Sequence, residues 1–156
     1  MRPEELKALG AIYFENISQG MQNPERYFWE SCRMDKKAAC LAAEKKMKDM
    51  GPGRAFCDFY YFQLESEARE KILGVLSEKE KRYLSDLKGR SRPGEVIFPL
   101  EKDLLSIAAG LNETEMLFST FYFTGPKEER STWWGNYRKE YLIFGERKYV
   151  RPYVKK

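Results

Sequence analysis

The sequence contains no histidine among its 156 residues, and this absence excludes several classes of function. Without an imidazole, the chain cannot form a Ser-His-Asp or a Cys-His catalytic arrangement. It also cannot form a zinc site that combines Cys with His, or change its charge near neutral pH through histidine. We therefore expect no catalytic residue of these classes, no metal site and no cofactor.

Cysteine is scarce as well. The three cysteines, Cys32, Cys40 and Cys57, leave one thiol over after any pairing, and none lies in a C-x-x-C motif. Free thiols are typical of a reducing compartment, so we expect a cytoplasmic protein with three reduced cysteines.

Long apolar runs are missing too. Residues 1–5 are mostly charged and no apolar run follows them, so a signal peptide is not expected. No segment approaches the roughly 20 apolar residues that cross a bilayer, so no membrane association is expected.

Nucleotide-binding signatures are absent from the sequence, which has neither a G-x-x-x-x-G-K-[ST] loop nor a G-x-G-x-x-G motif after a strand. Acid-x-acid pairs do occur, and in principle they could bind Mg²⁺. We interpret them as surface or helix-end residues. The pairs are Glu65/Glu67, Glu101/Asp103 and Glu113/Glu115.

What the chain does contain is apolar and aromatic material for a core. Hydrophobic residues make up 42% and aromatic residues 15% of the sequence. A chain of this size buries roughly 70% of its unfolded surface, which is enough for one ordinary core. We therefore expect a single domain over residues 1–156.

Apolar residues at helical spacing predict that most of residues 3–88 are helical. The first helix is expected at about 3–20. The second is expected at about 24–50, with two helices that meet near Asp35 as an alternative.

Two interpretations remain open for the next segment. Apolar residues recur every four positions over 56–76 and favour a long helix. Five of the seven residues 56–62 are aromatic, however, and these favour a strand. Ser77 and Glu80 then match a capping box, which predicts a helix over 78–88.

The second half of the chain changes its pattern. A short strand and a short helix are expected within 95–110. Residues 116–123 resemble a buried strand and residues 133–144 alternate, so 116–144 should form a β-hairpin. The expected fold class is α+β, with a helical N-terminal half packed on a small antiparallel sheet built around this hairpin.

Positive charge gathers at the C-terminal end. Residues 138–156 contain seven basic and two acidic residues, a net charge of +5, whereas the whole chain has +4. Basic residues mixed with Tyr149 and Tyr153 can bind phosphates and stack on bases. The alternative is a basic tail, residues 145–156, that only keeps the protein soluble.

The alternation over 133–144 also suggests a contact surface. If Trp133, Tyr137 and Tyr141 fill the core, Trp134 and its neighbours turn outward. Exposed tryptophan beside arginine is typical of protein interfaces. The expected partner-binding residues are Trp134, Asn136, Arg138, Arg147, Lys148 and Arg151, with Arg90 and Arg92 of the loop 89–94 as secondary candidates.

The leading hypothesis is therefore a non-catalytic binding or regulatory protein that contacts a partner protein through its aromatic and basic C-terminal hairpin. A nucleic-acid-binding protein, with a winged helix or the basic C-terminus as its contact, is the first alternative. A phage or mobile-element inhibitor of a host protein and a histidine-free metal-dependent enzyme are the others.

Overall fold

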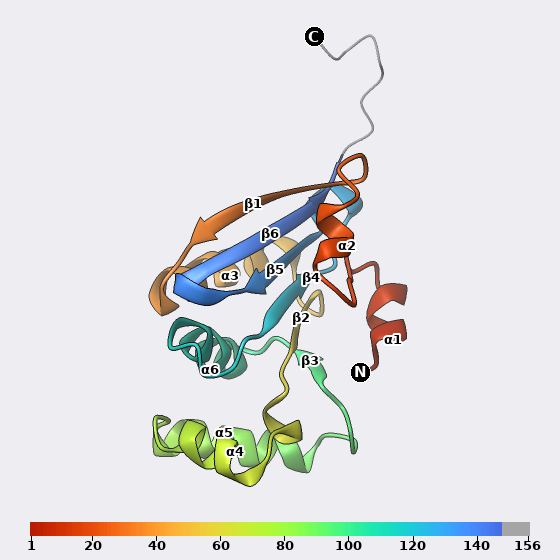
Figure 1. The fold of residues 1–156 in the computed structure, drawn as a ribbon. Coiled ribbons are helices and arrows are strands. Elements are labelled where there is room, and N and C mark those ends of the chain that lie inside the picture. The colour runs from red at the N-terminus through yellow and green to blue at the C-terminus, as the bar shows by residue number, and fades with distance from the viewer. Residues whose placement is uncertain (148–156) are drawn as a thin grey trace, which may run out of the picture.

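The computed structural model describes residues 1–147, and these form an α+β fold, as the sequence predicts (Figure 1). One antiparallel sheet has the strand order β1-β6-β5-β4-β2-β3. The described helices are α1 (Pro3–Ala8), α2 (Ser18–Met21), α3 (Lys36–Met50), α4 (Ser66–Leu73), α5 (Glu78–Gly89) and α6 (Lys102–Glu113), with 3₁₀ turns at Tyr61–Gln63, Lys127–Glu129 and Tyr137–Lys139. The strands are β1 (Tyr27–Arg33), β2 (Ala55–Asp58), β3 (Ile97–Pro99), β4 (Thr120–Phe123), β5 (Ser131–Gly135) and β6 (Glu140–Glu146).

The first two long helices of the sequence prediction are wrong in part. α1 ends at Ala8, because Gly10 takes a φ of 93° that a helix does not allow. The second expected helix is a strand, β1, followed by α3, whose N-cap Asp35 accepts a hydrogen bond from the backbone N of Ala38 at 2.8 Å.

The long helix over 56–76 is also wrong, and the strand interpretation holds for its beginning. The chain forms β2, a 3₁₀ turn and then the eight-residue α4. The capping box of Ser77 and Glu80 is confirmed at the start of α5, where the Ser77 hydroxyl accepts from the backbone N of Glu80 at 3.1 Å.

The C-terminal strand of the expected hairpin is divided into two. β5 ends at Gly135, a turn with positive φ at Arg138 and Lys139 reverses the chain, and β6 pairs back on β5. β4 and β5 form the preceding hairpin. Tyr137, which was expected in the core, lies in the turn and is 61% exposed.

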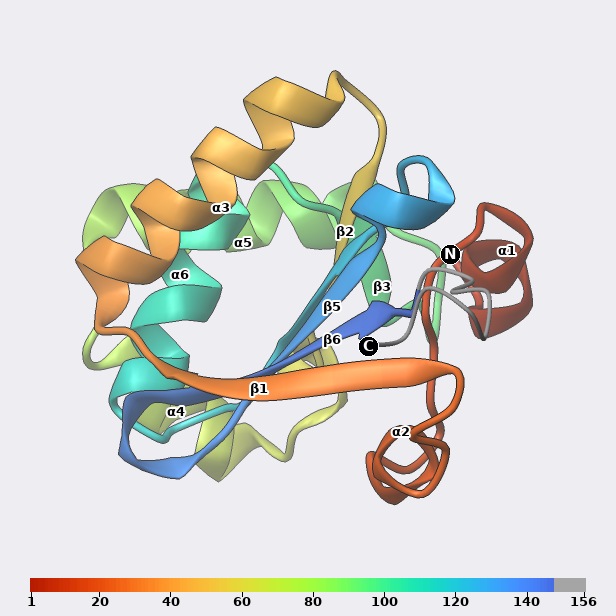
Figure 2. The same cartoon turned by 90° about the horizontal axis from the view of Figure 1, so that it is seen from above.

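The sheet separates two layers, which Figure 2 shows from above. α3 and α6 lie on one side and α1 and α2 on the other. The larger core fills the α3/α6 side, where Cys57, Phe121 and Tyr141 are buried against the helices. We call the opposite side the N-terminal face, because Leu6 packs there on Phe56, Ile97 and Tyr122.

Among the described residues, no helix combines the length and the apolar character that crossing a membrane requires.

Candidate binding pocket

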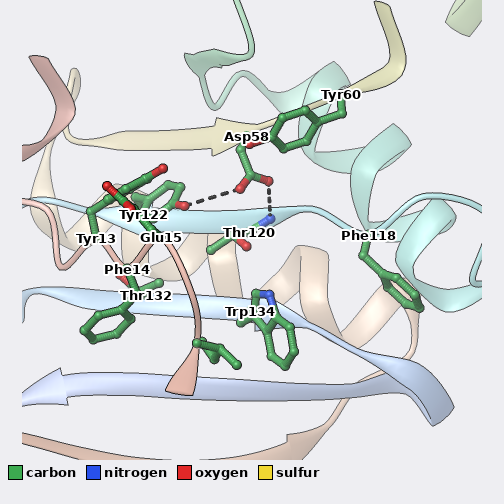
Figure 3. Close-up of a pocket in the computed structure, with 11 residues that line it drawn as sticks. Tyr13, Phe14, Glu15, Asp58, Tyr60, Phe118, Thr120, Tyr122, Thr132 and Trp134 are labelled. Carbon is green, nitrogen blue, oxygen red and sulfur yellow. Dashed lines mark hydrogen bonds between the residues drawn. The ribbon is translucent and has the colours of Figure 1, made fainter. Parts of the chain in front are cut away.

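A pocket opens on the N-terminal face between the sheet and the segment that joins α1 to α2. Its volume is about 240 Å³. We call it the Asp58 pocket, and Figure 3 shows its side chains. It is lined by Tyr13, Phe14, Glu15, Ile17, Asp58, Tyr60, Phe118, Thr120, Tyr122, Thr132 and Trp134.

The sheet register brings the sheet residues of the pocket together. Thr120 of β4 lies directly opposite Trp134 of β5, and Tyr122 lies opposite Thr132. Alternate residues of a strand point to the same side, so these four side chains share the N-terminal face. Their neighbours Phe121 and Trp133 point into the larger core.

The other wall is held by contacts of the N-terminal segment. The Thr132 hydroxyl donates to the carbonyl oxygen of Ile12 at 2.6 Å. Next to it, the Tyr13 ring stacks on Tyr122 with 5.9 Å between ring centroids. Phe14 packs edge-on against Phe144 at 5.2 Å. These contacts fix the segment as it crosses the sheet.

Asp58 lies at the floor of the pocket, where the pairing of β2 with β4 ends. The last paired residues are Cys57 and Phe121. Asp58 Oδ1 accepts a hydrogen bond from the backbone N of Thr120 at 2.7 Å, and Oδ2 accepts from the Tyr122 hydroxyl at 3.3 Å (Figure 3). The carboxylate thus satisfies a donor that the ladder leaves free.

The electrostatics of the pocket follow from burial. Burial raises the pKa of Asp58 from its ordinary value of 3.8 to about 6, although the hydrogen bonds from Thr120 and Tyr122 oppose the shift. Burial, and then the nearby Asp58 charge, raise the pKa of Tyr13, Tyr60 and Tyr122. The phenols therefore stay protonated near neutral pH and can donate hydrogen bonds.

The structure brings together only some of the residues that the sequence suggested. Trp134 is half-buried and lines the Asp58 pocket. Asn136 lies just after the end of β5, and its backbone N donates to the carbonyl oxygen of Glu140 at 2.9 Å. Arg138 is exposed in the β5–β6 turn, and its backbone N donates to Glu115 Oε2 at 2.9 Å.

Arg147 lies at the far end of β6. Its backbone N donates to the carbonyl oxygen of Arg26 at 2.7 Å, and its Nε donates to that of Pro24. Seven residues of β6 separate it from the β5–β6 turn, roughly 23 Å along an extended strand. Arg147 therefore does not share a patch with Arg138, and Lys148 and Arg151 lie outside the described residues.

The secondary candidates Arg90 and Arg92 are engaged within the protein. Arg90 forms two hydrogen bonds to Glu101, at 2.7 and 3.2 Å, and its Nε lies 3.4 Å from Asp86. Arg92 lies 3.6 Å from a carboxylate oxygen of Glu5 and 3.6 Å from one of Glu95.

Sequence reasoning missed Asp58, although the sequence held a signal for it. It is the one acid within the aromatic run FCDFYYF of residues 56–62. An acid inside a segment that is otherwise apolar must be buried with its neighbours or face a cavity. The sequence gives no comparable indication that Tyr13 and Phe14 line the pocket. Their helical spacing predicts a helix at this position, and that helix does not form.

Comparison with protein-family models, with curated proteins and with solved structures gives no match for this chain. Within residues 1–147, no group of three or more Cys, Asp or Glu side chains is placed to hold a metal ion. The cysteines Cys32, Cys40 and Cys57 are all free, as expected.

Proposed function

We propose that this protein is a non-catalytic binding protein and that the Asp58 pocket is its recognition site for a partner protein. The observation that carries the proposal is the half-buried Trp134, whose side chain lines a recess with aromatic walls from separate segments. Tryptophan and tyrosine in such recesses supply most of the binding free energy at many protein interfaces.

The size of the pocket supports a single side chain as its occupant. Pockets for small molecules and cofactors usually measure roughly 300–1,000 Å³. The Asp58 pocket, at about 240 Å³, lies below that range. Exposed aromatic residues continue the surface around it, since Tyr60 is 41% exposed and Tyr137 packs edge-on against Phe118 at 4.8 Å.

Nucleic acid is a poorer fit to this pocket. The acids Asp58 and Glu15 line it, and carboxylates repel phosphates. None of the described residues that line the pocket is Lys or Arg, so no basic side chain there could bind phosphate.

The test compares Trp134→Ala with Trp29→Ala, because Trp29 is another tryptophan, 44% exposed, on the edge strand β1. Proteins captured from the source cells by the unchanged protein and by Trp29→Ala should include at least one that Trp134→Ala loses. With that partner purified, Trp134→Ala should weaken binding at least about thirtyfold, which corresponds to about 2 kcal/mol. If all three proteins capture and bind the same partners equally, the Asp58 pocket is not the recognition site.

A further inference from the structure

Asp58 is a carboxylate at the floor of a pocket, and nothing in residues 1–147 forms an ion pair with it. Its two hydrogen bonds come from neutral donors, the backbone N of Thr120 at 2.7 Å and the Tyr122 hydroxyl at 3.3 Å. A desolvated carboxylate is unfavourable unless a positive charge balances it. A cation would therefore be a favourable partner for the carboxylate at the floor of the pocket.

The other groups that line the pocket also favour a positively charged ligand. Glu15 is the second acid of the pocket, and none of the described residues that line it is Lys or Arg. The remaining polar groups are hydroxyls of tyrosine and threonine, which can accept hydrogen bonds from an ammonium or guanidinium group. The lining thus favours positive ligands and disfavours negative ones.

The aromatic walls add to this preference. Figure 3 shows the Asp58 carboxylate between the rings of Tyr60 and Tyr122, with Trp134 on the other side of Thr120. Aromatic rings attract cations, and tryptophan does so most strongly. Tyr13 contributes its hydroxyl and its edge, because its ring already stacks on Tyr122 and has the Lys7 ammonium 5.2 Å from its centroid.

Apolar side chains complete the pocket. Phe14, Ile17 and Phe118 line it beside the polar floor. Such a lining suits an aliphatic stem that ends in a charged group, because the stem buries apolar surface while its end reaches the carboxylate.

We propose that the Asp58 pocket binds one organic cation, an ammonium or guanidinium group on an aliphatic stem, as at the end of a lysine or arginine side chain, with Asp58 as its counter-ion. This inference rests on the proposed function, since it specifies which side chain of the partner enters the pocket.

The affinity for a cation must then depend on pH. The groups that face Asp58 are the backbone N of Thr120 and the Tyr122 hydroxyl from β4, Tyr13 and Glu15 from the N-terminal segment, and Tyr60 from the turn after β2. Because the pKa of Asp58 is raised to about 6, the carboxylate is mostly ionised at pH 7.5 and about one-tenth ionised at pH 5. Cation binding should weaken about tenfold over this range.

The experiment uses three small probes and the full chain. N-acetyl-lysine methylamide and N-acetyl-arginine methylamide carry the cation, and N-acetyl-norleucine methylamide has a similar stem without charge. Titrations followed by NMR shifts of the Trp134 indole at pH 7.5 should show that at least one cationic probe binds about tenfold more tightly than the norleucine probe. The tighter of the two cations distinguishes an ammonium site from a guanidinium site.

Asp58→Asn removes the charge and keeps an acceptor for the backbone N of Thr120. It should lower the preference for cations about tenfold, whereas Asp49→Asn, at an exposed position of α3, should keep it. If Asp58→Asn fails to fold, the unchanged protein gives the same test. Its preference for the cationic probes over the norleucine probe must fall when the pH is lowered from 7.5 to 5.

Binding of the norleucine probe as tightly as both cationic probes would overturn the inference, and so would no binding of either cation at tens of millimolar. Neither result would overturn the proposed function, which depends on whether Trp134→Ala loses the captured partner. Conversely, cation binding with full retention of that partner by Trp134→Ala would overturn the proposed function and leave a small-molecule cation site.

Discussion

At the scale of single residues, Asp58 links the stability of the fold to the chemistry of the pocket. Its carboxylate accepts the hydrogen bond from the backbone N of Thr120 at the end of the β2–β4 pairing. The same position removes it from water and raises its pKa to about 6. The residue therefore stabilises the strand end by its hydrogen bond, while its buried negative charge destabilises the folded state.

This cost should appear as a pH dependence of stability. The folded pKa of Asp58 is about 6 and its ordinary value is 3.8, so between these values the unfolded chain has released a proton that the folded protein still holds. Proton uptake by Asp58 therefore contributes fully to the free energy of unfolding below about pH 4. This contribution is lost, and the free energy of unfolding falls, as the pH rises through 6. A shift of about two units corresponds to roughly 2–3 kcal/mol. Urea unfolding of the unchanged protein and of Asp58→Asn should show the variant gaining relative stability by this amount from pH 4 to pH 7.

The difference between the two proteins isolates Asp58, because every other group titrates in both. A difference in stability that stays constant from pH 4 to pH 7 would show that Asp58 is solvated and has an ordinary pKa.

Among the candidate residues, the structure has Trp133 in the core and Trp134 on the opposite side of the sheet, as the alternation predicts, whereas Tyr137 and Arg138 do not continue this pattern. The contrast between Trp133 and Trp134 depends only on the alternation of one strand, and it holds because β5 is regular through both residues. Tyr137 and Arg138 lie beyond the end of β5, where the chain turns with a φ of 60° at Arg138. A non-glycine residue with positive φ is uncommon, so the position of such a turn cannot be predicted from the pattern of residue types.

At the scale of elements, β1 is the strand that the sequence prediction made a helix, and it has no regular buried face. β1 pairs with β6 along its whole length, yet Phe28 and Trp29 are both near 45% exposed. Without one consistently buried side, an edge strand shows no alternation, and its apolar residues fell by chance at helical spacing. By contrast, β4 is buried throughout and the capping box begins α5, so both were recognised from sequence.

The junction between α6 and the hairpin of β5 and β6 depends on one small residue. Asn112 of α6 is buried, its Nδ2 donates to the Tyr141 hydroxyl at 3.1 Å, and its Oδ1 accepts from the backbone N of Ser119 at 2.8 Å. A Cβ at Gly135 would lie 2.7 Å from the Asn112 amide. The space beside Gly135 is therefore what allows Asn112 to make both hydrogen bonds.

Gly135→Ala should destabilise the protein by about 2–3 kcal/mol, because moving the amide leaves buried polar groups unpaired. The melting temperature should fall by roughly 5–10 °C for a chain of this size. Gly89→Ala is the matched control, since a Cβ there meets nothing within 4 Å at the exposed end of α5. It should be neutral or stabilising by up to about 1 kcal/mol. A melting temperature unchanged by Gly135→Ala would mean that α6 and the hairpin adjust without loss.

At the scale of the whole molecule, the two sides of the sheet are covered differently. α3 and α6 build the larger core on one side, whereas α1, α2 and the segment between them cover the other. Segments with few buried contacts open locally at lower free energy than the core. The Asp58 pocket thus lies on the side of the sheet where local opening should be easiest.

Alkylation of Cys57 can report how readily the larger core opens. This residue lies in β2, and its side chain is fully buried in that core. Burial raises its pKa well above the ordinary value, which further slows its reaction with alkylating agents. In a variant with Cys32→Ser and Cys40→Ser, native alkylation of Cys57 should be slowed at least about a thousandfold relative to the unfolded chain, as expected when only global unfolding exposes it.

The dependence on urea identifies the opening that exposes Cys57. If only global unfolding does so, the alkylation rate must rise with urea along the same slope as the unfolding equilibrium, because that slope reports the surface exposed. A variant that keeps only Cys32, half-buried on the edge strand β1, should react faster and with little urea dependence. If Cys57 shows the same weak dependence as Cys32, local opening exposes the larger core around β2, and the floor of the Asp58 pocket is not held by that core.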